Sequence, residues 1–188
     1  MANTATNVQA GKPNINGAIY FAPLGTALPT STKDELNTAF ACLGYVSEDG
    51  VSNDNAPENT DVKAWGGDVV LSTQTSKTDT WSYKLIESLN TTVLKAVYGE
   101  DNVSGDMATG LTIKATTEEV PAGVYVIDTS LGDANKRIVI PNGKISGMET
   151  ITYKDDEPVG YSLTVTGIST YVESAGKSVT HLEYLLSA

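Results

Sequence analysis

The sequence has little of the residue types from which most catalytic and redox sites are built. Its 188 residues include one cysteine, Cys42, and one histidine, His181. A single cysteine excludes an intramolecular disulfide, and the apolar neighbours of Cys42 favour a small buried side chain there. A Ser-His-Asp or Cys-His arrangement would have to use His181, and the sequence contains no Gly-x-Ser-x-Gly motif. These residues predict a protein that is not an enzyme.

Positive charge is scarce as well, because 12 Lys and Arg face 23 Asp and Glu, for a formal net charge of -11. Binding to nucleic-acid phosphates needs patches of Lys and Arg, and the densest basic spot is the pair Lys136 and Arg137 beside Asp133. This composition argues against a conventional DNA-binding protein. A negative surface still suits a protein that lies near DNA without gripping it, since like charges repel.

Long apolar runs and ligand-binding motifs are missing too. No stretch approaches the roughly 18 apolar residues of a membrane-spanning helix, and the first residues lack the pattern of a signal peptide. The acidic run 155–157 lacks the alternating oxygen ligands of a calcium loop. Gly66–Gly67 and Asn142–Gly143 are not followed by the Lys-Ser/Thr of a phosphate-binding loop. We therefore expect no membrane insertion by this chain, no metal site and no cofactor.

What the sequence does contain is a series of short strand signals. In the segment 78–86, apolar residues alternate with polar ones from Trp81 to Leu85, the period-2 pattern of a half-buried strand. Further apolar or alternating runs end at turn residues and predict strands at 18–22, 43–46, 68–73, 111–115, 123–128, 137–140, 145–153, 160–167 and 181–186. Many short strands predict a β-sandwich or barrel.

Helix signals are few. Asn90 is a good N-cap, apolar residues of the segment 93–98 fall on one helical face, and Gly99 supplies a stop, so a helix of about two turns is predicted. The segment 34–40 is a second candidate, capped by Ser31 or Thr32.

Two polar segments contain too few apolar residues to form a core. Residues 1–16 predict a flexible N-terminal arm, which leaves residues 17–188 as a single β domain. Residues 47–67 are dominated by Asp, Asn, Glu and Gly and predict a long projecting loop, in which Val51 and Val62 could flank a hairpin.

Seven short stretches, in order along the chain, resemble the major tail proteins, or tail-tube proteins, of long, non-contractile-tailed bacteriophages. They are Gly17–Thr26, Leu43–Val51, Ala64–Asp68, Leu85–Glu87, Val93–Gly99, Arg137–Pro141 and Ile151–Asp156. No single stretch is diagnostic, but seven in register are specific. The likeness extends from about Gly17 to Val165.

The resemblance implies a mainly β tail-tube fold, with two antiparallel sheets packed as a sandwich or barrel, one flanking short α-helix and a long projecting loop. It also implies a structural virion protein, assembled in the host bacterial cytoplasm, whose hexameric rings stack into a tail tube for DNA passage. Its partners would be further copies of itself, tail initiator or tip and tail terminator proteins, and a tape-measure protein in the lumen. DNA would pass without specific binding.

Six residues of the projecting loop are predicted to lie near a contact between rings. They are Glu48, Asp49, Asp54, Glu58, Asp61 and Trp65. The alternative is that they occupy a solvated surface loop. Two other functions stay open at this stage: a surface-decorating host- or carbohydrate-binding β-domain, and an inner tube subunit of a contractile injection system.

Overall fold

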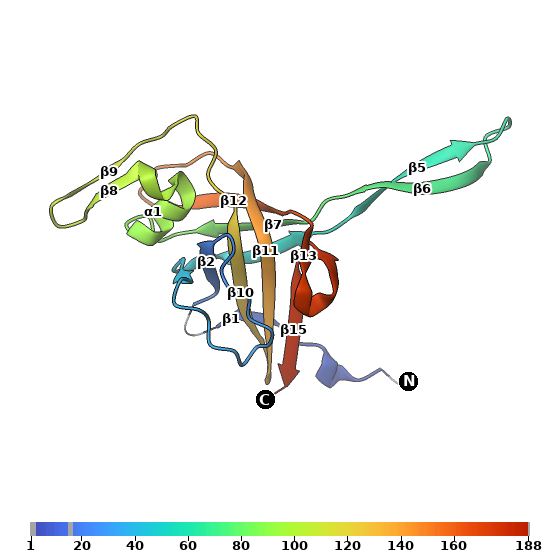
Figure 1. Cartoon of the computed structure of the whole chain (residues 1–188), viewed down its shortest axis with the longest axis horizontal. Coiled ribbons are helices and arrows are strands. Elements are labelled where there is room, and N and C mark those ends of the chain that lie inside the picture. The colour runs from blue at the N-terminus through green and yellow to red at the C-terminus, as the bar shows by residue number, and fades with distance from the viewer. Residues whose placement is uncertain (1–2, 15–16, 188) are drawn as a thin grey trace.

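The computed structural model describes residues 3–14 and 17–187, and these form a mainly β fold with one α-helix (Figure 1). The first half contains η1 (Ala5–Asn7), β1 (Gly11–Pro13), β2 (Ile19–Pro23), β3 (Ala41–Cys42), β4 (Val46–Asp54), β5 (Pro57–Lys63), β6 (Val69–Lys77), β7 (Thr80–Leu85) and α1 (Thr91–Tyr98). The second half contains η2 (Glu100–Asn102), β8 (Val103–Asp106), β9 (Gly110–Ile113), β10 (Gly123–Leu131), β11 (Ala134–Met148), β12 (Tyr161–Gly167), β13 (Thr170–Val172), η3 (Glu173–Ala175), β14 (Lys177–Val179) and β15 (Leu182–Ser187).

Nine of these strands form one antiparallel sheet. Its order is β3-β2-β10-β11-β12-β7-β4, with β1 beside β10 and β15 beside β11. Three separate two-stranded ribbons complete the described strands: β5–β6, β8–β9 and β13–β14. The predicted mainly β class with antiparallel sheets and a short helix is confirmed. The two sheets that were expected are one continuous sheet in the structure: β2, β10 and the first part of β11 form one layer, β12, β7 and β4 form the other, and β11 joins them.

β11 joins the layers because its two ends have different partners. Its first part pairs with β10 and β15, and its last part, from Gly143 to Met148, pairs with β12. The register against β10 shifts between Tyr125 and Gly123, opposite Pro141. Proline has no N–H to donate to a ladder, so it is tolerated at such an irregularity. The sheet can therefore change direction within one strand.

The main core lies between the two layers. Inward-facing side chains of β7 and β12 belong to one buried cluster with those of β10 and β11 and with the apolar face of α1. Its fully buried members include Tyr125, Leu85, Leu94, Ile127 and Ile140. The alternation expected for 78–86 is confirmed, since Trp81, Tyr83 and Leu85 are buried while their neighbours are only partly buried.

The other face of β10 is covered by the loop 24–40. Val124, Val126 and Val139 form a second buried cluster, against which Leu36 and Phe40 pack. The helix predicted at 34–40 is wrong, because the structure has no helix there. The Asp34 carboxylate instead accepts hydrogen bonds from the backbone N–H groups of Thr30 and Ser31 and from both hydroxyls, and this local bonding favours a turn over a helix.

The helix predicted after residue 90 is confirmed as α1. The Asn90 side chain accepts a hydrogen bond from the Thr92 N–H at 2.9 Å, and Gly99 ends the helix with φ 94°. Val93, Leu94 and Val97 are buried on its inner face. The helix thus flanks the core, as the apolar spacing predicts.

The two polar segments are ordered differently from each other. In the predicted arm 1–16, residues 1–2 and 15–16 lie outside the described residues, while Gly11–Pro13 pairs with β10. Within 47–67, residues up to Asp54 belong to β4, and Val51 to Asp54 pair with β7 in the main sheet. The element that projects is the β5–β6 hairpin, which extends the projection from the predicted limit at 67 to Lys77.

Candidate assembly surface

The β5–β6 hairpin, residues 57–77, stands away from the body of the protein (Figure 1). Seven residues of β5 at about 3.3 Å each give it a reach of about 20 Å. Every residue from 57 to 77 is exposed, and among the described strands β5 pairs only with β6. An isolated two-stranded hairpin is at best marginally stable in water. The hairpin therefore lacks the packing partner that most ribbons have.

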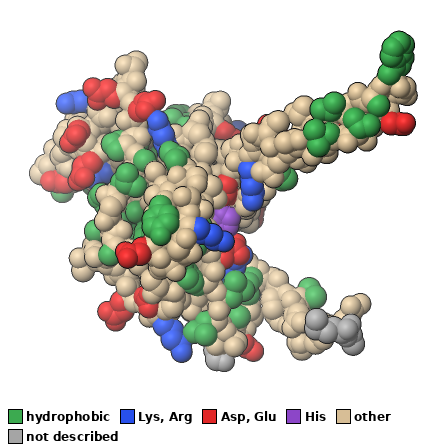
Figure 2. Space-filling view, turned by 45° about the vertical axis from the view of Figure 1, so that its right-hand side comes forward, with side chains coloured by type: hydrophobic (Ala, Val, Ile, Leu, Met, Phe, Trp, Pro, Cys, Tyr) green, Lys and Arg blue, Asp and Glu red, His purple; other side chains and the backbone are tan. Residues whose placement is uncertain are grey.

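Hydrophobic side chains gather on the outer half of this hairpin (Figure 2). Val62 and Leu71 face each other across the two strands and are 50% and 55% exposed. Val69 and Val70 are 53% and 63% exposed, and Trp65 is fully exposed at 107%. Contiguous exposed apolar surface on a projecting element marks a site of association.

The turn at the end of the hairpin fixes how Trp65 is presented. Gly67 N–H donates to the Ala64 carbonyl at 3.0 Å, and Ala64 N–H donates to the Asp68 carbonyl at 2.8 Å. Gly66 and Gly67 have φ angles of 121° and 99°, which side chains with a Cβ rarely adopt. The two glycines thus permit a tight turn between β5 and β6, and Trp65 lies within this turn.

The inner half of the hairpin is polar and held by side-chain bonds between the strands. Ser76 donates a hydrogen bond to Glu58, and Ser72 donates one to Asp61, each at 2.6 Å. These two acids, which the sequence predicts at an interface, therefore stiffen the hairpin. A stiff stalk lowers the conformational entropy that the tip must lose on binding.

The six residues predicted at a contact are spread along one continuous path rather than gathered at one point. Glu48, Asp49 and Asp54 belong to β4, and Glu58 and Asp61 to β5, with Trp65 at the turn. All six side chains are exposed. Their role at an interface stays a prediction.

The apolar residues 69–71 also belong to this surface, although the sequence predicts the segment 68–73 as a strand of the body. An apolar run is typical of a buried strand. The sequence does contain a signal for a hairpin. The polar runs 57–63 and 72–77 lie on either side of the turn residues Gly66–Gly67, as the two strands of one hairpin would.

The base of the hairpin is anchored by Asp79, which is 1% exposed. Its carboxylate accepts hydrogen bonds from Asn53 Nδ2 at 2.8 Å and lies 2.5 Å from His181 Nδ1. The His181 ring also meets Trp81 edge-on, with centroids 5.2 Å apart. The Asp79 carboxylate thus links Asn53, near the end of β4, to His181, which directly precedes β15, at the point where the hairpin leaves the body.

This anchor predicts an acid-dependent loss of stability. Burial would raise the pKa of Asp79, but hydrogen bonds from Thr180, His181 and Asn53 outweigh burial and hold the pKa below its ordinary 3.8. A lowered folded-state pKa adds stability that is complete above pH 3.8 and is lost as the pH falls through the lower value. Asp79→Asn should therefore be less stable than wild type in urea unfolding at neutral pH, with a gap that narrows in strong acid.

A matched control is Asp155→Asn, in an exposed turn, which should track the wild type at every pH. A gap for Asp79→Asn that stays constant from neutral pH into strong acid would contradict the role of the ionised carboxylate.

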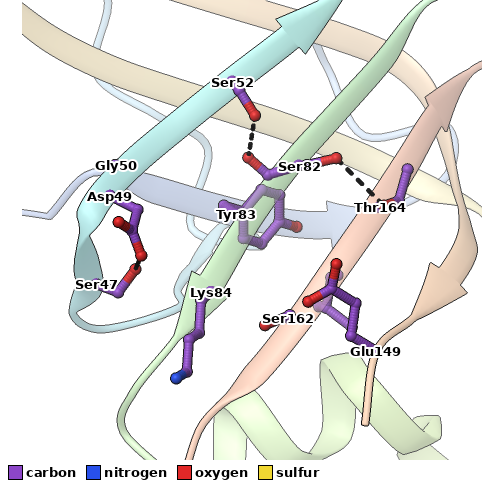
Figure 3. A pocket seen from close by; sticks show the side chains of 11 residues that line it. Ser47, Asp49, Gly50, Ser52, Ser82, Tyr83, Lys84, Glu149, Ser162 and Thr164 are labelled. Carbon is purple, nitrogen blue, oxygen red and sulfur yellow. Dashed lines mark hydrogen bonds between the residues drawn. The ribbon is translucent and has the colours of Figure 1, made fainter.

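A second surface, on the outer face of β4, β7 and β12, carries hydroxyl groups around a shallow hollow (Figure 3). Ser52 donates to the Ser82 carbonyl at 3.4 Å, and the hydroxyls of Ser82 and Thr164 lie 3.2 Å apart. The hollow measures about 180 Å³, which is small beside the roughly 300–1,000 Å³ of ligand pockets. Groups that satisfy one another in this way favour a hydrated surface over a reactive site.

Two further observations concern the described residues, 3–14 and 17–187. No group of three or more His, Cys, Asp or Glu side chains in this part of the chain could hold a metal ion. None of its helices is long and apolar enough to cross a membrane.

Comparison with known proteins adds a family to this geometry. The family model described as phage tail tube protein matches residues 3–176, which is most of the chain. No curated protein matches the sequence.

Proposed function

The chain belongs to the phage tail tube protein family, and from this premise we propose that its copies form hexameric rings that stack into the tube of a non-contractile tail. The tube is a structural component of the virion, assembled in the host cytoplasm. It grows from a tail initiator or tip complex, encloses a tape-measure protein and ends at a terminator protein. DNA then passes through its channel.

The observation that supports self-assembly best is the unpartnered β5–β6 hairpin. Trp65 and four aliphatic side chains are exposed on an element whose two strands, among those the structure describes, pair only with each other. Exposing this apolar surface in an isolated chain is unfavourable, by about 25 cal/mol for each Å² that a partner could cover. Contact between copies removes the surface from water, so we expect the hairpin to carry the contact between rings.

Open sheet edges offer a second kind of contact. Among the described strands, β4 pairs only with β7, and β15 pairs only with β11, so each has one edge without a partner. Unpaired strand edges are templates for strand addition by another chain. We propose that such edges contribute to contacts within a ring.

The charge of the chain suits a channel for DNA. A formal net charge of -11 repels phosphates, so the chain as a whole does not attract a moving duplex. DNA is therefore conducted without specific binding in this proposal.

The test is negative-stain electron microscopy of the purified chain, with and without a tail-initiator complex as a seed. Tubes with a stained central channel are expected, and discrete particles under both conditions would contradict self-assembly. A matched pair of variants sharpens the test: Trp65→Ala and Tyr171→Ala, which is 66% exposed on β13.

Trp65→Ala is expected to raise the protein concentration needed for tube growth by about 30-fold, because a buried aromatic hot spot contributes 2 kcal/mol or more. The melting temperature of the free chain should not change, since Trp65 contacts water in that state. Light scattering during seeded growth measures the effect. Tyr171→Ala should grow like wild type, and equal growth of all three proteins would remove Trp65 from the contact.

A further inference from the structure

An open groove lies at the opposite end of β4 from the hairpin. It is bounded by β1, by the residues that follow β3 and by the first part of β4, and its volume is about 710 Å³. Most of its lining is apolar or small, including Pro13, Ala18, Cys42, Val46 and Val51. Such a groove has the size and character of a site that receives a bulky apolar side chain.

An irregularity in β4 shapes one wall of this groove. The register against β7 shifts between Val46 and Val51. Val46 pairs with Leu85 and Val51 pairs with Tyr83, so five residues along β4 correspond to two along β7. Residues 47–50 lie opposite the single residue Lys84 and bulge from the sheet, and Gly50 within them has φ 71°. Bulges of this kind redirect side chains away from the ladder. Here the bulge places Glu48 on the groove.

The hairpin of the same copy cannot fill the groove. β4 runs from the groove to the base of the hairpin, and the hairpin continues away from the body for about 20 Å (Figure 1). The tip, which we define as Val62 to Leu71, therefore points away from the groove of its own chain.

The tip and the groove are complementary in charge as well as in apolar character. Lys63 and Asp68 flank Trp65 in the tip, and Lys12 and Glu48 line the groove. None of these four side chains forms an ion pair with another described residue. The third charged residue of the groove, Glu87, already accepts hydrogen bonds from the Tyr45 N–H and from Asn90 Nδ2. This leaves Glu48 to meet Lys63 and Lys12 to meet Asp68.

We propose that the tip of one copy seats in this groove of a neighbouring copy, with Trp65 in the apolar part and the two charge pairs at the rim. The inference rests on the proposed self-assembly and names its acceptor site. Each copy then offers one tip and one groove, so the contact is heterologous and leaves both ends of a stack open. A contact of this kind propagates instead of closing into a dimer.

Cys42 provides a direct test, because it lines the groove and is the only cysteine. Val70→Cys places a second thiol in the tip and keeps Trp65. In assembled tubes, a short bis-maleimide should link the new thiol to Cys42 of another copy, and peptide mass spectrometry should identify the link. Ser104→Cys, on the exposed β8 strand, is the matched control. Equal cross-linking of the two variants to Cys42 would overturn the proposal.

Charge exchange gives an independent measurement on exposed residues that should not disturb folding. Glu48→Lys and Lys63→Glu each place like charges together and should slow seeded tube growth about tenfold. The double variant restores opposite charges and should recover most of the rate. If the double variant slows tube growth by the product of the two single-variant reductions, the pairing of Glu48 with Lys63 is contradicted.

The two levels of the hypothesis fail differently. If the wild-type chain forms no tubes even with a seed, self-assembly itself is refuted. If wild-type tubes form but the new thiol does not reach Cys42 and the double variant is not rescued, only the groove is refuted as the acceptor.

Discussion

Replacing residues 58–76 with a Gly-Gly link is expected to leave a folded chain that forms no tubes. Pro57 and Lys77 face each other in the register of the hairpin, so a two-residue turn can join them. The removed residues are all exposed and contribute nothing to either buried cluster. The melting temperature should therefore stay close to that of wild type, while electron microscopy of seeded samples should show no growth.

The matched control shortens the other long exposed ribbon. Replacing residues 107–109 of the β8–β9 turn with Gly-Gly also removes exposed residues, but from a separate hairpin elsewhere on the protein. That variant should still form tubes. Wild-type growth by the chain without its β5–β6 hairpin would show that the hairpin is dispensable for assembly, and would shift attention to the open edges of β4 and β15.

The hairpin also shows where prediction from this sequence reaches its limit. The strand β5 reads Pro-Glu-Asn-Thr-Asp-Val-Lys, with no period-2 apolar pattern, because neither of its faces is buried in the chain. Residues 69–71 are apolar, so the sequence predicts them to be buried in the body, whereas the structure exposes them on the hairpin. Hydrophobic pattern predicts burial, but it does not say whether the same chain or another copy provides the partner.

Other elements were predictable because local chemistry and tertiary burial agree. The alternation around Tyr83 matches a strand with one face in the core, and Asn90 and Gly99 cap a helix whose apolar face is buried. The predicted strands 145–153 and 160–167 do pair with each other as the end of β11 and β12, although β11 ends at Met148 and a connection over 149–160 follows it. In these places each level of structure favours the same answer.

The loop 24–40 was harder to predict because its order comes from residues far away in sequence. The spacing of Leu36 and Phe40 is compatible with a helix, yet both side chains pack on the outer face of β10 and β11 from a turn. The Arg137 guanidinium donates hydrogen bonds to the carbonyls of Ser31 and Asp34 at 3.0 and 2.8 Å. In the sequence Arg137 appears only as half of a basic pair, with no sign that it is buried.

Arg137→Leu is expected to lower the free energy of unfolding by about 3–5 kcal/mol. The guanidinium makes two parallel bonds to the Asp128 carboxylate, at 2.7 and 2.8 Å, and both residues are buried. Removing one partner leaves the other charge buried without compensation. Leucine also cannot bond the loop carbonyls, so the cover over Val124 should loosen. Urea unfolding at neutral pH measures the loss.

The adjacent lysine separates this effect from a general loss of positive charge. Lys136 pairs with Glu183 at 2.8 Å, but both side chains are partly exposed, at 25% and 36%. An ion pair in contact with water contributes about 0–1 kcal/mol, so Lys136→Leu should unfold close to wild type. Similar losses for the two variants would mean that the Arg137–Asp128 pair is not the buried link between the sheet and its covering loop. A large loss for Arg137→Leu alone would identify it as that link.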